Sequence, residues 1–153
     1  MSNTSPPLGY MLKNAQSLLH VRMEEALKPL QLTVSHYSCL HNLRLEPGIS
    51  ASDLARRTFV TRQSMNVMLQ QLIDRGLVSR PTQADSGRAL PSALTPAGTE
   101  ALTAAEVLVN AVEARMLGAL TPNARAALAE GLAACVTALA DPTESVRNSR
   151  AAN

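Results

Sequence analysis

Apolar side chains recur every three or four residues along most of this chain, the spacing that places them on one face of a helix. This pattern predicts helices at about residues 9–30, 34–45, 51–58, 61–75, 96–120 and 122–140. Polar, proline-containing stretches at 1–8 and 141–153 predict flexible tails at the two ends. We therefore expect a single domain over about residues 9–140.

A β-hairpin is expected between the fourth and fifth helices. Leu77–Arg80 and Arg88–Leu94 are short runs of mixed apolar and polar residues on either side of a polar loop at 82–87. Pro81 and Pro91 lack an N–H group, which suits exposed edge strands rather than the centre of a sheet. The predicted fold class is mainly α with one small β-hairpin.

Residues that cap helices stand at the expected boundaries. Thr61, Thr95 and Thr121 each precede a helix, and a proline follows the last two directly. Ser50 and Asp53 resemble a capping box at the start of the third helix. A cation and then a glycine, Arg75-Gly76, end the fourth helix.

The third and fourth helices and the turn between them predict a helix-turn-helix unit. The third helix is short, and the turn at residues 58–60 is tight. A hairpin directly after such a unit makes it a winged helix, here over about residues 33–95. A small core between the two helices is expected from residues Leu54, Ala55, Val60, Met65 and Leu69.

The outward face of helix 61–75 is polar at its N-terminal end. Met65, Met68, Leu69 and Leu72 have the spacing of a buried stripe. Arginine, glutamine and asparagine at this end of a helix can read base edges in the DNA major groove. The first turn contains no acid, although the helix dipole favours one there, and a DNA partner explains that absence. An exposed helix start without function remains the alternative. The outward side chains are Thr61, Arg62, Gln63, Ser64, Asn66 and Val67.

The positive charge is concentrated in the middle of the chain. The formal net charge is only +2 at pH 7, but residues 33–95 hold seven arginines against four acids, and residues 96–153 hold four arginines against six. Arginine forms paired hydrogen bonds with phosphate and guanine edges, which lysine cannot do. The middle segment is therefore the candidate surface for an anionic partner, although a solvated face explains the imbalance as well.

Several segments occur in a particular order: Leu32-Thr33, Asp53-Leu54-Ala55, the stretch 72–80 that leads into the hairpin, and Leu94-Thr95 before a helix. This ordered run resembles the core of the MarR family of bacterial transcription regulators. The flanking helices match in number and order, so the resemblance covers most of the chain. It implies a sequence-specific DNA-binding regulator, and we expect a repressor.

The resemblance also implies a homodimer that binds a palindromic DNA operator. Helices at about 9–30 and 96–140 would form the dimer interface. A core within one chain explains part of the same apolar stripes, so the sequence leaves their division open. One such stripe consists of residues Leu102, Ala105, Val109, Val112 and Met116.

Four further arginines are expected to contact DNA. In the family an arginine at the hairpin tip enters the minor groove, and Arg88 falls on that position. The aspartate that usually precedes it is replaced by Ser86, and Asp85 stands one residue early, so the partner that orients the arginine is open. The expected phosphate contacts, which position a protein without specifying sequence, are Arg56, Arg57 and Arg80.

Many members of the family bind small phenolic or aromatic acids that weaken DNA binding. Arg22 lies on the apolar stripe of the first helix, and a buried arginine requires an anion. That anion is a ligand carboxylate, Glu25 or an acid of the second copy. Tyr37 and His41 share a face of the second helix and could flank an aromatic ring, although core packing also explains them.

Other kinds of chemistry have little support. His41 lies about 140° around a regular helix from His36, so these residues and Cys39 do not predict a metal site. No nucleophile motif or glycine-rich phosphate loop occurs, so we expect neither an enzyme nor a cofactor. A winged-helix module that binds protein rather than DNA is an alternative function.

The N-terminus lacks the basic and apolar order of a secretory signal, and no apolar run approaches the roughly 18 residues of a membrane span. A cytoplasmic protein is therefore expected. Cys39 and Cys135 are expected to be free thiols in packing roles. A redox switch through Cys39 is an alternative, but the peroxide-sensing relatives use a cysteine in the first helix, and this first helix has none.

Overall fold

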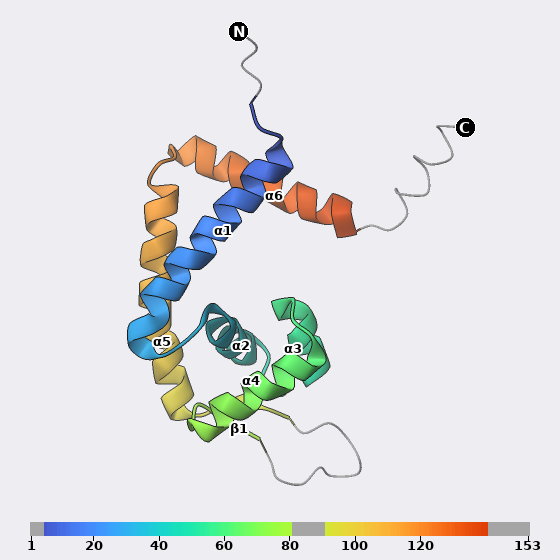
Figure 1. Ribbon diagram of the computed structural model, residues 1–153, viewed down its shortest axis with the longest axis vertical. Helices are drawn as coiled ribbons and strands as arrows, with labels where there is room; N and C mark the ends of the chain where they lie inside the picture. The colour runs from blue at the N-terminus through green and yellow to red at the C-terminus, as the bar shows by residue number, and fades with distance from the viewer. Residues whose placement is uncertain (1–4, 81–90, 141–153) are drawn as a thin grey trace, which may run out of the picture. The chain divides into compact units, whose positions relative to one another are not determined.

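The computed structural model describes residues 5–80 and 91–140. It forms two compact units, one up to residue 113 and one from residue 114 onward. Figure 1 traces the elements along the chain. Their order is α1 (Leu8–Leu27), η1 (Lys28–Leu30), α2 (Val34–Leu45), α3 (Ala51–Thr58), α4 (Arg62–Asp74), β1 (Val78–Ser79), β2 (Ala93–Leu94), α5 (Pro96–Leu117) and α6 (Pro122–Ala140). The predicted fold class, mainly helical with one small hairpin, is confirmed.

The first helix ends three residues earlier than the apolar stripe predicted. Pro29 removes a backbone donor and its ring crowds the preceding turn, so the chain tightens into η1 after Leu27. Gln31 then adopts a left-handed conformation with φ 55°, which turns the chain toward α2. The Glu24 carboxylate accepts a hydrogen bond of 3.0 Å from the Val34 N–H, which joins the end of α1 to the start of α2.

Helix α2 begins and ends where predicted, with a cap that the sequence did not reveal. The Thr33 hydroxyl accepts a hydrogen bond from the His36 N–H, and His36 Nδ1 accepts one from the Thr33 N–H. A capping box usually has glutamate or glutamine in the place of His36. The other ring nitrogen, Nε2, lies 3.1 Å from the Gln71 Oε1, so the same side chain also connects α2 to α4.

The helix-turn-helix unit consists of α3, the turn and α4, with the predicted boundaries. The Ser50 hydroxyl accepts from the Asp53 N–H, but the Asp53 carboxylate accepts from that hydroxyl instead of the Ser50 N–H, so only half of the expected capping box forms. Thr61 caps α4 by accepting a hydrogen bond of 3.1 Å from the Ser64 N–H. Between them Phe59 has a left-handed conformation with φ 59°, which ends α3.

The C-terminal end of α4 is attached to the segment between α1 and α2. The Arg75 guanidinium donates hydrogen bonds of 2.7 Å to the Gln31 carbonyl and 3.3 Å to the Leu30 carbonyl. Gly76 follows with φ 72°, the left-handed exit that the sequence predicted.

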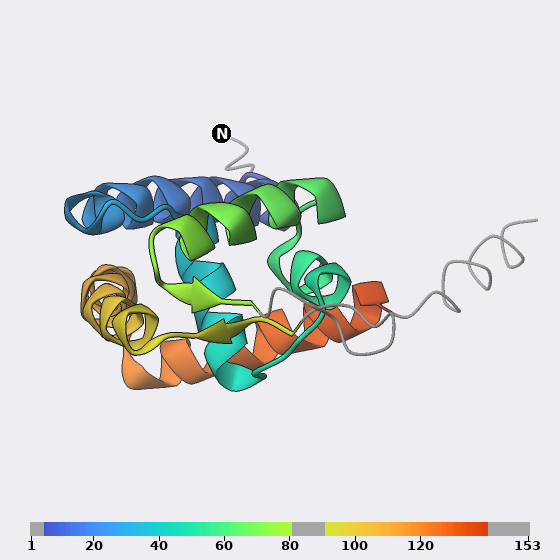
Figure 2. The same cartoon turned by 90° about the horizontal axis from the view of Figure 1, so that it is seen from below.

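The core of the first unit lies where α2, α3 and α4 meet. As predicted, Leu54, Ala55, Met65 and Leu69 are buried, and Val60 packs against them half-buried. Figure 2 shows α4 running above the strand pair, and Val78 of β1 completes the core. The other buried apolar side chains include Leu27, Leu32, Leu40, Leu43, Leu72, Leu102 and Ala105.

The two strands form the predicted hairpin base. Val78 pairs with Leu94 and Ser79 with Ala93 in antiparallel register. The first turn of α5 then approaches Leu77, the residue before β1, so closely that a Cβ atom on Gly98 would lie 1.9 Å from the Leu77 carbonyl oxygen. A glycine is therefore required at this contact.

Both C-terminal helices begin at the predicted caps. The Thr95 hydroxyl accepts from the Gly98 N–H, and the Thr121 hydroxyl accepts from the Ala124 N–H. Helix α5 ends at Leu117 rather than at about residue 120, where the last residues form a turn. No residue of α6 is buried within one chain, so the packing role predicted for Cys135 is wrong for the single chain. Across residues 5–80 and 91–140, every helix is too short or too polar to cross a membrane.

Candidate nucleic-acid interface

The N-terminal end of α4 presents the six predicted side chains outward. Met65, Leu69 and Leu72 are buried and hold the helix on the core, whereas the whole set is exposed: Thr61, Arg62, Gln63, Ser64, Asn66 and Val67. Thr61 and Ser64 are partly occupied by the helix cap, and their hydroxyl groups are 2.9 Å apart. Within the described part of the chain, no hydrogen bond engages the side chains of Arg62, Gln63 and Asn66. Three long polar side chains are therefore free to bind a partner.

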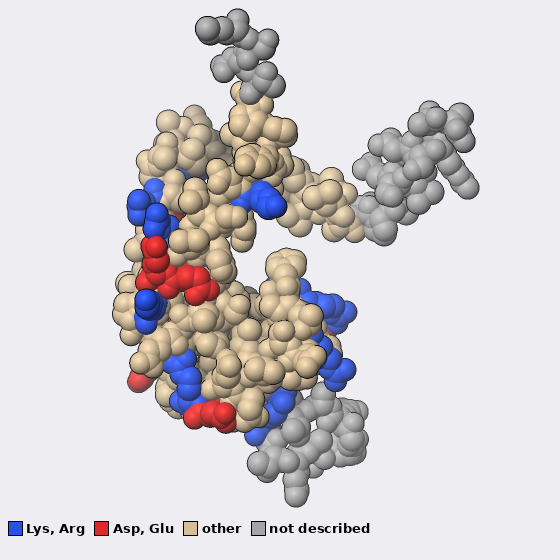
Figure 3. All heavy atoms as spheres, in the orientation of Figure 1, with Lys and Arg blue, Asp and Glu red and all other residues tan. Residues whose placement is uncertain are grey.

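Two predicted phosphate contacts lie on α3, next to this surface. Arg56 forms an ion pair with Asp53, and Arg57 forms one with Glu46. Figure 3 shows Lys and Arg side chains gathered on the flank of the molecule that carries α3 and the start of α4. Because exposed ion pairs contribute about 0–1 kcal/mol, a phosphate group can replace either carboxylate at little cost.

The remaining two arginines belong to the hairpin. Arg80 follows β1, and its Nε donates a hydrogen bond of 3.2 Å to the hydroxyl of Ser92, which is buried beside β2. This bond fixes Arg80 at the base of the hairpin. Arg88, predicted to enter the minor groove, lies outside the described residues, as do Asp85 and Ser86.

The predicted effector residues do not lie in one buried site. Arg22 is 47% exposed, so its expected burial is wrong for the single chain. The reason is that Leu27, at the C-terminal end, is the only residue of α1 that the described structure buries, whereas Leu18 and Val21 beside Arg22 are exposed. The Arg22 guanidinium lies 3.0 and 2.8 Å from the two Glu25 carboxylate oxygens, which is one of the anions that the sequence proposed.

Tyr37 and His41 do share a face of α2. Their rings stack with centroids 6.0 Å apart and an angle of 26° between the planes. Beside them Arg44 forms an ion pair with Glu106 of α5, whose carboxylate lies 3.9 Å from His41 Nδ1. Among the described residues that nitrogen is buried without a hydrogen-bond partner. The sequence did not reveal this cluster because Arg44 and Glu106 are 62 residues apart.

The residues of this cluster shift one another's pKa values. The hydrogen bond from Arg44 lowers the pKa of the Glu106 carboxyl below its ordinary value. Burial, with a smaller effect from Glu106, raises the pKa of the Tyr37 hydroxyl. At neutral pH a neutral phenol, a carboxylate and a guanidinium therefore surround the His41 ring.

A model of the MarR family matches residues 30–89. The HTH-type transcriptional repressor Rv2887 of Mycobacterium tuberculosis is 44% identical over 115 residues, which make up 75% of this chain and 83% of that protein. The chain belongs to the MarR family.

Two solved structures extend this similarity to the arrangement of the elements. The crystal structure of Rv2887 in complex with DNA has a TM-score of 0.74 and 37% identity, covering 86% of this chain and 98% of that chain. The crystal structure of Rv2887 in complex with salicylic acid has a TM-score of 0.72 and 39% identity, with the same coverage of both chains.

This MarR-family chain has a protected thiol in its core. Burial raises the pKa of Cys39 to about 12, so the thiol is protonated at neutral pH and is a poor nucleophile. Its sulfur lies 3.9 Å from the Met65 sulfur, which is a packing contact. In the parts of the chain that the structure describes, no group of three metal-ligating side chains comes together.

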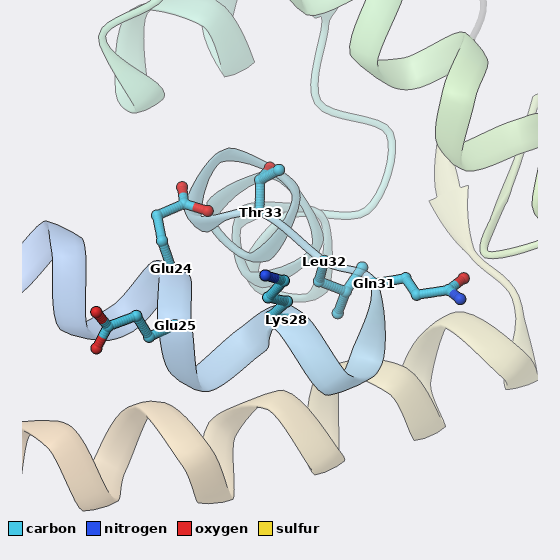
Figure 4. A pocket seen from close by; sticks show the side chains of 6 residues that line it. All are labelled: Glu24, Glu25, Lys28, Gln31, Leu32 and Thr33. Atoms are coloured by element: carbon cyan, nitrogen blue, oxygen red, sulfur yellow. The ribbon is translucent and has the colours of Figure 1, made fainter.

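One open cavity of about 470 Å³ lies where α1 meets α2 in this MarR-family chain (Figure 4). Glu24 and Glu25 contribute two carboxylates to its wall against the single amine of Lys28. The net charge of the wall therefore disfavours an anionic ligand there. Its remaining lining residues are Gln31, Leu32 and Thr33.

Proposed function

We propose that this protein is a cytoplasmic transcriptional repressor that binds a palindromic DNA operator as a homodimer and is released by a small aromatic acid. The observation that carries DNA binding is the exposed end of α4, where Arg62, Gln63 and Asn66 have no partner among the described residues. Crystal structures of the relative Rv2887, a transcriptional repressor, have been determined in complex with DNA and with salicylic acid, which supports both ligands here.

Base reading is assigned to the N-terminal end of α4, and backbone binding to the arginines around it. A helix held by a buried stripe can enter the major groove with its N-terminal side chains leading. Arginine pairs with guanine, and glutamine or asparagine with adenine. In this proposal the backbone contacts come from Arg56, Arg57 and Arg80, with Arg88 in the minor groove.

Selection and sequencing of the DNA that the purified protein retains would identify the operator. Binding to it should weaken steeply as salt rises, because neutralised phosphates release counterions. Arg62→Ala or Gln63→Ala should each lower the preference for operator over random DNA by about 1–3 kcal/mol. Arg57→Ala should weaken binding to both DNAs about equally and serves as the matched control.

Unchanged discrimination in both Arg62→Ala and Gln63→Ala would show that base reading lies elsewhere. A protein that retains no preferred DNA and binds without salt dependence would instead favour the alternative function, a winged-helix module that binds protein.

Dimerisation is assigned to α1, α5 and α6, which expose apolar side chains within one chain. On α6 these are Leu128, Leu132, Val136 and Leu139, spaced three or four residues apart. Such a stripe is unfavourable in water, and a second copy would cover it. Val136 is 67% exposed, so Val136→Asp should produce a monomer in sedimentation velocity if the stripe is the interface.

Val67→Asp provides the control, because it adds the same charge to an exposed apolar side chain on α4. It should leave the dimer intact and weaken only DNA binding. A dimer that survives Val136→Asp would remove α6 from the interface.

The effector site is assigned to Arg22 with Tyr37 and His41, as the carboxylate and ring contacts of an aromatic acid. Because Arg22 already forms an ion pair with Glu25, the ligand carboxylate must displace the Glu25 carboxylate to bind Arg22. Arg22→Ala should abolish release of the operator by salicylate while leaving DNA affinity unchanged.

Arg44→Ala is the informative comparison, because Arg44 is the arginine whose ion pair with Glu106 lies beside His41. Release that is lost in Arg44→Ala but kept in Arg22→Ala would move the carboxylate contact to Arg44. The ligand must bind more tightly to the dimer state that does not bind DNA than to the state that does. For each variant, both the release of operator DNA by salicylate and the affinity of salicylate for the DNA-free protein are therefore measured.

A further inference from the structure

Phe59, in the turn between α3 and α4, is a large apolar side chain in an unfavourable place. It is 95% exposed, the largest exposed fraction among the large apolar side chains of the described residues. Its backbone is left-handed, with φ 59° and ψ 36°, which is an outlier for a bulky residue. The fold thus bears both backbone strain and an unburied ring at a single position.

The turn itself explains the conformation but not the ring. A left-handed residue is needed to end α3, and here the Val60 N–H donates to the Ala55 carbonyl at 3.1 Å across the turn. Glycine or asparagine would meet that need with little or no strain. The ring has no role in the core, because the buried cluster closes beneath it without Phe59.

The position of Phe59 explains the ring better. It stands two residues before Thr61, the cap of α4, and two after Arg57. Along the chain it therefore stands between the arginine assigned above to a phosphate and the side chains assigned to base edges. Figure 1 shows this turn joining the two helices at the start of α4.

We propose that Phe59 contacts the C5-methyl group of a thymine at the edge of the operator major groove, and so adds a preference for thymine to the polar contacts of α4. This inference rests on the proposed DNA-binding function. The thymine methyl is the apolar group that a base pair presents in the major groove, and phenylalanine is one of the side chains that contact it. Burying the ring there removes from water the surface that the free protein leaves exposed.

The test combines a side-chain change with a change in the DNA. Each thymine of the selected operator half-site is replaced in turn by deoxyuridine, which lacks the methyl group and keeps the base pairing. At one position the wild-type affinity should fall about fourfold, the effect of one buried methyl group. Because Phe59→Ala removes the ring from both copies of the dimer, it should weaken operator binding by at least about sixteenfold, the product of two fourfold effects, and show no further loss at that same position.

Alanine is the appropriate replacement because it keeps a Cβ atom at a positive φ, so the backbone strain is unchanged. Val67→Ala is the matched control, because it shortens another exposed apolar side chain, on α4. Its loss of affinity should couple to the methyl group of a different thymine or of none. Unfolding midpoints and sedimentation of Phe59→Ala should match those of the wild type.

Four results would overturn the proposal. The first is an operator affinity in Phe59→Ala equal to that of the wild type. The second is an equal loss of affinity for operator and random DNA, which indicates that the ring contacts deoxyribose. The third is that no thymine has a methyl group whose removal couples to Phe59→Ala. The fourth is a dimer that dissociates in Phe59→Ala, which would assign the ring to a protein interface instead. If the wild-type protein itself selects no DNA sequence, the proposed function fails, and that outcome is distinct from each of these.

Discussion

The close approach of the first turn of α5 to Leu77, the residue before β1, gives the sharpest prediction for stability, through the substitution Gly98→Ala. The new Cβ atom would lie 1.9 Å from the Leu77 carbonyl oxygen and 2.9 Å from its carbonyl carbon, where contacts below 3.0 Å essentially never occur. Both atoms belong to the backbone, so no side chain can rotate away. The separation must grow from 1.9 Å to at least 3.0 Å.

That movement also disturbs two hydrogen bonds across the same contact. The Thr95 N–H donates to the Leu77 carbonyl at 3.1 Å, and the Thr95 hydroxyl donates to the Gly76 carbonyl at 2.6 Å. Overpacking costs about 1–3 kcal/mol, and a backbone clash belongs near the upper end of that range. Alanine recovers up to about 1 kcal/mol of helix propensity, so the net loss is about 2 kcal/mol.

A loss of this size lowers Tm by about 4–8 °C in a protein of this length. Urea unfolding followed by circular dichroism at one fixed protein concentration measures it, because the stability of a dimer depends on concentration. Gly131→Ala in α6 is the matched control, since nothing in the described part of the chain outside the neighbouring helix backbone lies within 4 Å of its added Cβ atom. That substitution should stabilise by up to about 1 kcal/mol. If Gly98→Ala were as stable as Gly131→Ala, the close approach of α5 to Leu77 would be refuted.

Three further predictions concern single side chains. Phe59→Gly relieves a left-handed strain of about 1–2 kcal/mol, offset in part by the greater freedom of glycine in the unfolded chain, so it should raise the urea midpoint while weakening operator binding; a lower midpoint would contradict the strain. In Cys135→Ser the remaining thiol, Cys39, should react with iodoacetamide at pH 8 only on unfolding, because its pKa of about 12 and its burial protect it; rapid alkylation of the folded protein would contradict this. Glu106→Gln should destabilise the protein at pH 7. Because the folded pKa of Glu106 is lowered, the ion pair contributes its full stability above the ordinary glutamate pKa, and this stability is lost as pH falls through the folded pKa. The difference in stability from wild type should therefore vanish in acid. A difference that does not change with pH would exclude the ion pair as its cause.

The elements that were predicted correctly are those specified by local signals. The caps Ser50 and Thr61 and the glycine at 76 determine where α3 and α4 lie, and the spacing of Met65, Leu69 and Leu72 determines which side of α4 is buried. Each of these signals acts within one or two turns of helix, so the chain order alone reveals it.

What the sequence did not reveal depends on contacts distant along the chain or on unusual backbone. The pairing of Arg44 with Glu106 has no local signature, and the left-handed Phe59 departs from the glycine that usually marks such a turn. The expected burial of Arg22 failed for a different reason. An apolar stripe indicates that one face of a helix is buried, but it does not indicate whether the same chain or a second copy buries it.

The attachment of Arg75 to the carbonyl groups of Gln31 and Leu30 gives the two ends of α4 separate constraints. One end is anchored to the rest of the first unit, and the other projects side chains that the core does not need. Exchanging the exposed residues of 61–67 for those of another regulator, with the buried Met65 kept, should therefore redirect the protein to a new target sequence while preserving its fold. Target preference in this scaffold can thus diverge without redesign of the regions that support it.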